Sequence, residues 1–184
     1  MRLEPIEHPS NVLLRIAGWI TKRQFGKVIT PLKVIYSRKL PLLFIANKIY
    51  QFQEKSVSLE PSLRFLITTL VSRLNGCQFC NDISLAQTVQ RKLGSEKFFA
   101  LGDEIDINSH TFTPKEKAVI NFVNEYFEKR SISDETFNKL REYFDENQII
   151  EIVAINACEH YFNALAIPLG IESDGLRQLA LQEA

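Results

Sequence analysis

The residues best suited to chemistry are two cysteines separated by two positions, in the run Cys77-Gln-Phe-Cys80. Such a pair has three physical interpretations: a dithiol that cycles through a disulfide, half of a four-ligand zinc site, or two small residues that pack together. The other candidate zinc ligands in the sequence are Cys158, His8, His110 and His160. No two of them have the spacing of a structural zinc site, so we expect no metal and no cofactor.

The sequence around the pair favours the dithiol. Gly76 is expected to end one helix, and Cys77 stands where the next one begins. The free N–H groups and the dipole at a helix N-terminus stabilise a thiolate and lower its pKa from about 8.5. Two cysteines three positions apart on a first turn can also approach each other, so an oxidised sulfur has a resolving partner nearby.

The elements that must position this pair are all expected to be helices. Apolar residues recur at spacings of three and four through most of the chain, and no alternating strand bounded by hairpin turns is found. The predicted fold class is therefore all-α. Helices are expected from Ser10 as cap to Gly26, from Thr30, after Pro41, over 60–76, 77–93, 95–101 and 113–129, from Ser133, and over 145–165.

Several of these boundaries have specific signals. Thr113-Pro-Lys-Glu116 has the cap, first-turn proline and third-position glutamate of a capping box. Asp145 is a natural cap for the long last helix, which Pro168 and Gly170 should end. Pro41 interrupts its stretch, because proline removes a backbone donor, and so predicts two short helices with a bend.

Composition limits the class of partner and the compartment. The 184 residues include 45% hydrophobic residues, enough for the core of one domain, and 22 basic residues balance 22 acidic ones. No broad field would attract nucleic acid or an anionic membrane, so neither partner is expected. Three cysteines are too few for a secreted disulfide framework, and the N-terminus lacks the apolar stretch of a signal peptide. We expect a cytoplasmic protein.

The stretch from Leu59 to Cys80, with its Asn-Gly-Cys-Gln-Phe-Cys end, resembles the active-site helix pair of AhpD-like alkylhydroperoxidases and carboxymuconolactone decarboxylases. The later runs that begin at Phe112, Ile132 and Phe144 resemble the second half of these proteins in order and spacing, so that about residues 55–172 are covered. The resemblance implies an AhpD-like helical bundle over 59–172. An N-terminal helical extension (1–58) and a C-terminal tail (173–184) complete a single domain.

The resemblance also implies a function. A thiol-dependent oxidoreductase of the alkylhydroperoxidase type would reduce a peroxide or a disulfide through Cys77 and Cys80, and a cellular dithiol reductant would regenerate the pair. Such antioxidant peroxidases assemble as homodimers or larger homo-oligomers. The alternatives are a noncatalytic oligomeric module, in which the pair serves packing or a redox-dependent clip, and a carboxymuconolactone decarboxylase-like protein of another specificity.

The chain departs from the family pattern where the proton relay is expected. The positions of the usual glutamate and histidine hold Phe65 and Ser84, which do not titrate near neutral pH. Glu159 and His160 are the candidates to replace them, because they lie in an apolar stretch where an unpaired charge is costly. Ser84, one turn beyond Cys80, would donate to the thiolate or only to a backbone carbonyl.

Each of these residues also has a plainer interpretation. His160 and Glu159 would then be satisfied core or subunit-contact residues. Cys158 is expected to be a small buried residue, since helical cysteines commonly pack as hydrophobes. Asp82 and His110 are expected at the surface.

Overall fold

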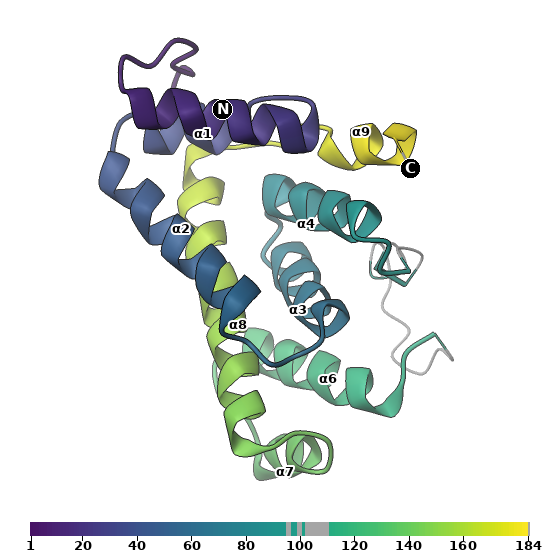
Figure 1. Cartoon of the computed structure of the whole chain (residues 1–184). Helices are drawn as coiled ribbons and strands as arrows, with labels where there is room; N and C mark the ends of the chain where they lie inside the picture. Colours follow the sequence, from purple (N-terminus) through teal and green to yellow (C-terminus); the bar gives the residue numbers. More distant parts are fainter. Residues whose placement is uncertain (95–96, 99–100, 102–110, 184) are drawn as a thin grey trace.

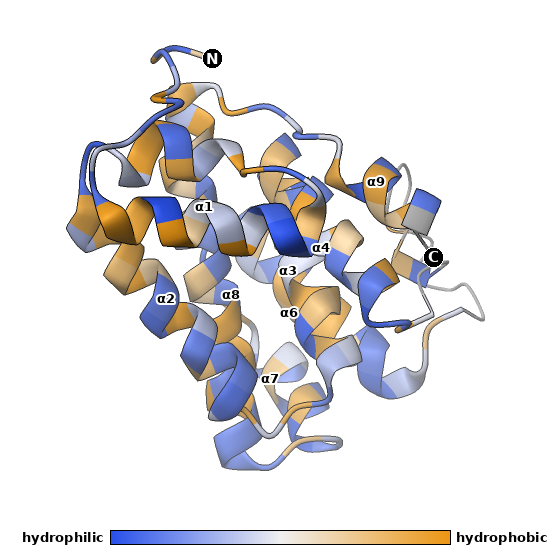
Figure 2. Ribbon diagram, turned by 45° about the horizontal axis from the view of Figure 1, so that its top comes forward, coloured by the Kyte–Doolittle hydropathy of each residue, from blue (hydrophilic) through white to orange (hydrophobic). Residues whose placement is uncertain are grey.

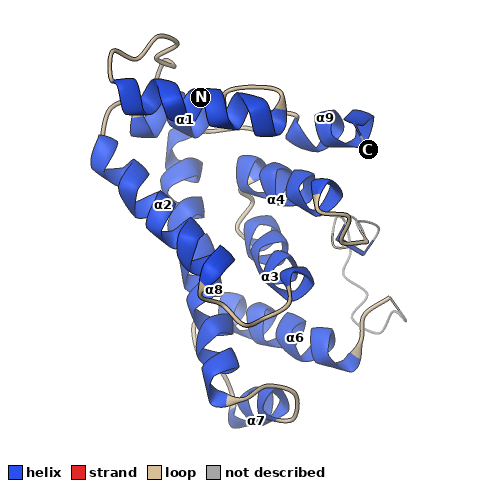
Figure 3. Ribbon diagram, viewed as in Figure 1, coloured by secondary structure: helices blue, strands red, loops and turns tan. Residues whose placement is uncertain are grey.

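The computed structural model of the chain describes residues 1–94, 97–98, 101 and 111–183. Within these ranges all regular structure is helical (Figure 3), which confirms the all-α class. Most of the helix expected at 95–101, and His110, lie outside the described residues. The elements are α1 (Val12–Phe25), the π-helical turn η1 (Leu32–Tyr36), α2 (Leu40–Lys55), α3 (Pro61–Leu74), α4 (Gln78–Gln90), α6 (Pro114–Lys129), α7 (Asp134–Arg141), α8 (Glu146–Ala166), the 3-10 turn η2 (Ile167–Leu169) and α9 (Leu176–Glu183).

Helix α3 occupies the centre of the fold and packs against α4, α6 and α8 (Figure 1). Its residues Leu63, Leu66 and Leu70 are buried, the last two fully. Ten consecutive residues of this helix, from Leu63 to Ser72, are buried, so neighbours cover it on all sides and not on one face only. This helix therefore fixes the position of everything that follows it, including the cysteine pair.

The predicted helix boundaries are largely confirmed. Thr113 and Glu116 form the reciprocal capping box of α6, and Asp145 caps α8. Gly76 ends the α3 turn with φ 71°, in the left-handed region that favours glycine. One cap differs: Asn11, not Ser10, starts α1, because its side-chain oxygen accepts from the Leu13 N–H at 2.9 Å.

The N-terminal segment is less tightly packed. The break expected near Pro41 is found between η1 and α2, but α2 runs for 16 residues and is not the short helix expected. No residue of α2 is fully buried, and the helix packs mainly against η1. Proline at its second position is compatible with a helix start, which is why α2 begins so close to Pro41.

The buried side chains form two clusters. One joins α3, α6 and α8 around Leu66, Phe122 and Ile152. The other contains Cys77 and Cys80, together with residues of α1, η1 and α9. The segment expected to be a tail contains α9, which packs on α4 through buried apolar residues, and is thus part of the second cluster.

Candidate active site

The cysteine pair lies at the start of α4, as the sequence analysis expected. Cys77 is the N-cap residue, and its sulfur accepts a hydrogen bond from the Cys80 N–H at 3.4 Å. The two Cα atoms are 5.3 Å apart and the sulfur atoms lie at disulfide-bonding distance. The left-handed turn at Gly76 reverses the chain between α3 and α4, and both cysteines belong to one buried cluster with residues of η1 and of the end of α8. This geometry suits a dithiol that closes to a disulfide.

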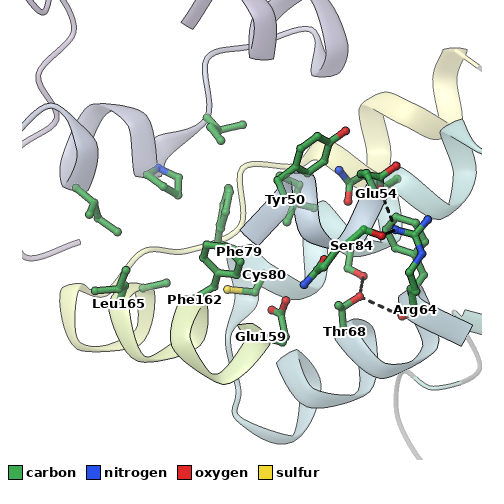
Figure 4. A pocket seen from close by; sticks show the side chains of 18 of the residues that line it. Tyr50, Glu54, Arg64, Thr68, Phe79, Cys80, Ser84, Glu159, Phe162 and Leu165 are labelled. Atoms are coloured by element: carbon green, nitrogen blue, oxygen red, sulfur yellow. Dashed lines mark hydrogen bonds and ion pairs between the residues drawn. The ribbon is translucent and has the colours of Figure 1, made fainter. Parts of the chain in front are cut away.

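The two sulfurs differ in what they face. Cys80 lines a cavity of about 200 Å³, whereas Cys77 is buried behind it and does not. Helices α2, α3, α4 and α8 form the walls, together with residues 29–36 (Figure 4). Most of the lining is apolar, and includes Ile35, Tyr36, Phe65, Phe79, Ile83 and Phe162. A ligand in this cavity would meet one sulfur only, in a setting poor in water.

Glu159 faces the same cavity from α8, and Figure 4 shows its carboxyl group and Cys80 turned into it. It is only 8% exposed, and its Oε1 accepts hydrogen bonds from Ser72 Oγ at 2.6 Å and from Asn163 Nδ2 at 2.8 Å. Burial raises the pKa of the Glu159 carboxyl to about 7, although these two hydrogen bonds act in the opposite direction. A carboxyl group with such a pKa can both take and give a proton near neutral pH.

His160 points elsewhere. Successive residues of an α-helix are about 100° apart around its axis, so His160 cannot share the direction of Glu159. Its Nδ1 lies 2.9 Å from Asn75 Nδ2, and its ring meets the edge of Tyr126 with 5.8 Å between centroids. Burial and, secondly, the charge of Arg130 lower the pKa of His160, which favours the neutral ring.

Hydrogen bonds nevertheless connect His160 to the cavity. Asn75 Nδ2 donates to Asn163 Oδ1 at 2.8 Å as well as facing the His160 ring. Asn163 in turn donates to Glu159. The residues chosen from the sequence, Glu159 and His160, therefore belong to one network, but only Glu159 borders the space in which a substrate would react.

Ser84 also lines the cavity, one turn after Cys80. Its hydroxyl group hydrogen-bonds with Thr68 Oγ1 at 3.0 Å and with Thr69 Oγ1 at 2.7 Å. Both partners come from α3, so this hydroxyl cluster joins α3 to α4, the helix that holds the cysteines. A role for Ser84 as donor to a thiolate stays a prediction. Phe65, the other departure from the family pattern, packs into the wall beside this cluster.

A group of charged residues at the cavity was missed by the sequence analysis. Arg64, on α3, is only 7% exposed and pairs with Glu54 Oε1 at 3.2 Å. Arg91 pairs with the same carboxylate, with 3.0 Å between Nη2 and Oε1. A signal was present: Arg64 is a charged residue in an apolar helix, which is the argument that singled out Glu159.

Two expectations about lesser residues are wrong. Asp82 is not at the surface but 7% exposed, and its carboxylate accepts from the N–H groups of Leu176 and Arg177, both at 2.9 Å. It therefore caps α9, a contact 94 residues distant in sequence that no local pattern announces. Cys158 is half-buried and not enclosed, because it lies on the outer side of α8.

No group of three or more histidine, cysteine, aspartate or glutamate side chains in the described ranges is arranged to hold a metal ion. The same part of the chain contains no helix that is both long and apolar enough to cross a membrane.

Comparison with solved structures defines the class of fold. An uncharacterized peroxidase-related protein from Ralstonia eutropha JMP134, described as an alkylhydroperoxidase AhpD core, superposes with a TM-score of 0.81 at 16% identity, over 96% of this chain and 95% of that one. The debrominase Bmp8, solved as a cysteine-to-alanine variant with 2,3,4-tribromopyrrole, gives a TM-score of 0.81 at 16% identity, over 100% and 97%. The chain thus has the AhpD-like helical fold, and its Cys77-x-x-Cys80 pair lies within it.

Among individual proteins, the chain is similar to YnjA of Escherichia coli (strain K12), an uncharacterized protein. The two are 24% identical over 168 residues, which cover 85% of this chain and 88% of YnjA. The chain matches no family model. The fold agrees with the resemblance found in the sequence.

Proposed function

We propose that the protein is a thiol-dependent oxidoreductase that reduces a peroxide or a disulfide through Cys77 and Cys80. The observation that carries this proposal is the asymmetry of the pair: Cys80 lines the cavity together with Glu159, while Cys77 is buried behind Cys80. Cys80 is accordingly the attacking cysteine and Cys77 the resolving one.

The reaction with a hydroperoxide has two steps. The Cys80 thiolate attacks the terminal peroxide oxygen, the O–O bond breaks, and the products are a Cys80 sulfenic acid and an alkoxide that takes up a proton. The Cys77 thiol then attacks the sulfenic sulfur, which forms the disulfide and releases water. The substrate gains two electrons and the cysteine pair loses two, which a dithiol reductant restores.

Glu159 is the proton carrier in this scheme. As a carboxylate it takes the proton of the Cys80 thiol, and as a carboxylic acid it returns that proton to the leaving alkoxide. Its pKa of about 7 makes both forms available at neutral pH. His160 is a positioning residue, since it acts on Glu159 through Asn75 and Asn163.

The proposal includes the setting in which the reaction runs. Only three cysteines occur, which suits the reducing cytoplasm, where a cellular dithiol would regenerate the pair.

A homo-oligomer is supported by exposed apolar side chains on α1 and α2, and α1 faces the viewer in Figure 2. Trp19 is 61% and Phe44 51% exposed, and a second copy would cover such residues.

The test is consumption of an organic hydroperoxide by the pre-reduced protein, followed by mass spectrometry of the cysteines. Wild-type protein should turn over with a dithiol and accumulate a Cys77–Cys80 disulfide without one. Cys80→Ser should abolish consumption. Cys77→Ser should stop after one equivalent, with a sulfenic acid on Cys80 that dimedone traps. Persistent free thiols and no consumption would instead support a noncatalytic module.

A second candidate reaction is reductive dehalogenation. It is favoured by the full-length structural similarity to the debrominase Bmp8 and by the aromatic lining of the cavity. In that case an aromatic carbon–bromine bond is replaced by a carbon–hydrogen bond, bromide leaves, and the cysteine pair again supplies two electrons. Release of bromide from 2,3,4-tribromopyrrole by the reduced protein, absent in Cys80→Ser, would distinguish this reaction from peroxide reduction.

A further inference from the structure

The cavity has a cationic end as well as a sulfur. Arg64 and Arg91 share the carboxylate of Glu54, so two positive groups meet one negative group. Arg64 is more than nine-tenths buried and lines the cavity. A buried guanidinium keeps its charge at all accessible pH values and therefore needs an anion or several acceptors around it.

Two hydrogen-bond donors at this end have no partner. Arg64 Nε and Gln53 Nε2 are buried and make no hydrogen bond with any described residue, and both side chains line the cavity. Arg64 Nη1, in contrast, donates both to the Gln53 carbonyl oxygen and to Glu54 Oε1. Buried donors are normally paired, so a small turn of either side chain toward the cavity would let an acceptor of a bound ligand satisfy it.

The cationic end and the sulfur are separated along the cavity. Arg64 stands one turn before Thr68 on α3, and Cys80 stands one turn before Ser84 on α4, each turn being about 5.4 Å of rise. Thr68 and Ser84 lie between them and hydrogen-bond with each other at 3.0 Å. Figure 4 shows the order: Cys80 on one side, the hydroxyl pair in the middle, and Arg64 with Glu54 on the other.

Apart from this hydroxyl pair, the space between the two ends is bordered mainly by apolar side chains. Phe65, Phe79 and Ile83 line it from α3 and α4, and Phe162 lines it from α8. A volume of about 200 Å³ admits a single ring with a short chain and not a long acyl chain. From one end to the other, the cavity thus offers a positively charged pair of donors, an apolar middle section and a reactive sulfur.

We infer that the cavity binds a small organic acid whose carboxylate is held by Arg64 and Gln53, whose ring or short alkyl body lies among the phenylalanines, and whose reducible group reaches Cys80. The identity of the reacting end rests on the proposed function. Recognition of the carboxylate does not, because it depends only on α2 and α3 residues remote from the sulfur.

Binding of matched probes tests this inference. The probes are 3-phenylpropionate and 3-phenylpropanamide, which share a shape and differ in charge, titrated calorimetrically into the full-length oxidised protein. We expect the carboxylate to bind about tenfold more tightly than the amide, as a charge-assisted hydrogen bond replaces a neutral one. Arg64→Met should remove this preference and leave the affinity for the amide unchanged.

Two further variants control the result. Gln53→Leu should weaken carboxylate binding by a smaller factor and guards against misfolding of Arg64→Met, which circular dichroism would reveal. Arg23→Met, an exposed arginine on α1 that stacks on Trp19, should change neither affinity. Equal binding of the two probes by the wild-type protein, or no binding of either, would overturn the inference.

The reduced protein locates the ligand and separates the two proposals. Bound 3-phenylpropionate should slow alkylation of Cys80 by iodoacetamide, in proportion to occupancy. Alkylation at an unchanged rate under saturating probe would place the acid outside the cavity and refute the inference. A protein that binds the acid at this site but consumes no peroxide would retain the inference and lose the proposed function.

Discussion

Helices α2 and α3 have comparable apolar content and both carry a proline in their first turn, yet they differ in burial. Ten residues of α3 are buried, whereas α2 has none. Both contribute to the cavity, α3 with Phe65 and Thr68, α2 with Tyr50 and Glu54. The cavity therefore has one wall fixed by the core and one wall held mainly by η1 and by ion pairs. The contrast shows that local sequence determines a helix, while its neighbours determine how firmly it is held.

The largest expected effect contrasts Glu159, the proposed proton carrier, with Tyr50 on α2. Glu159→Gln keeps an acceptor for Ser72 but cannot carry a proton, and should lower thiol-dependent turnover at pH 7 about 10²- to 10⁴-fold. Tyr50→Phe, on α2, should change turnover by no more than about twofold, because Tyr50 is 46% exposed. Steady-state peroxide reduction measures both. Comparable losses of turnover in the two variants would mean that α2 takes part in the chemistry as much as Glu159 does.

Stability should follow the same division. Leu66→Ala, at a fully enclosed position of α3, should lower the free energy of unfolding by about 3 to 4 kcal/mol. Ile45→Ala, at a 46% exposed position of α2, should lower it by about 0.5 kcal/mol or less. Urea denaturation of both variants checks the comparison. A large loss for Ile45→Ala, dependent on protein concentration, would indicate that a second copy covers α2.

The burial of Glu159 on α8 should also make stability depend on pH. The pKa of Glu159 rises from 4.5 to about 7 on folding, so between these values the native protein holds a proton that the unfolded chain has lost. The free energy of unfolding should accordingly fall as pH rises from about 4.5 to about 7, by up to about 3 kcal/mol. Glu159→Gln should lack this fall. Parallel curves for the two proteins between pH 5 and pH 8 would exclude a shifted Glu159.

The smallest effect concerns the residue that acts at a distance. His160→Gln should leave folding intact and slow turnover about tenfold, because the network that orients Glu159 loses its last member. The informative readout is the pH–rate profile, in which the limb that reports Glu159 should move. Unchanged turnover would remove His160 from the mechanism, and a slower rate with an unmoved profile would reduce it to a structural role.

Much of the fold was predictable because its signals are local. The capping box at Thr113, the cap at Asp145 and the left-handed turn at Gly76 each involve residues within one or two turns of each other. The length of α2 was not predictable in the same way. Pro41 reads equally as an interruption or as a first-turn residue, and the packing of η1 against α2 decides between them.

The candidate site was predictable in part. The cysteine pair and an acidic residue in an apolar helix stand out in the sequence, so Cys80 and Glu159, which both line the cavity, were among the predicted site residues. Only one of two neighbouring residues on α8, Glu159 and His160, can border the cavity. The choice depends on how α8 is rotated about its axis relative to α3 and α4, and the spacing of residues within α8 does not predict that rotation. The burial of Asp82 was not predicted for a related reason: its partner helix, α9, is 94 residues away in the sequence.

That partnership links the C-terminal segment to the candidate site. Asp82 stands two positions after Cys80, and its carboxylate is satisfied by the first two N–H groups of α9. Removal of the residues from 175 onward would take away both donors of Asp82 and uncover the face of α4 on which α9 packs. Helix α9 therefore anchors the start of α4, and we expect its removal to change the reactivity of Cys77 and Cys80 although no residue of α9 lines the cavity.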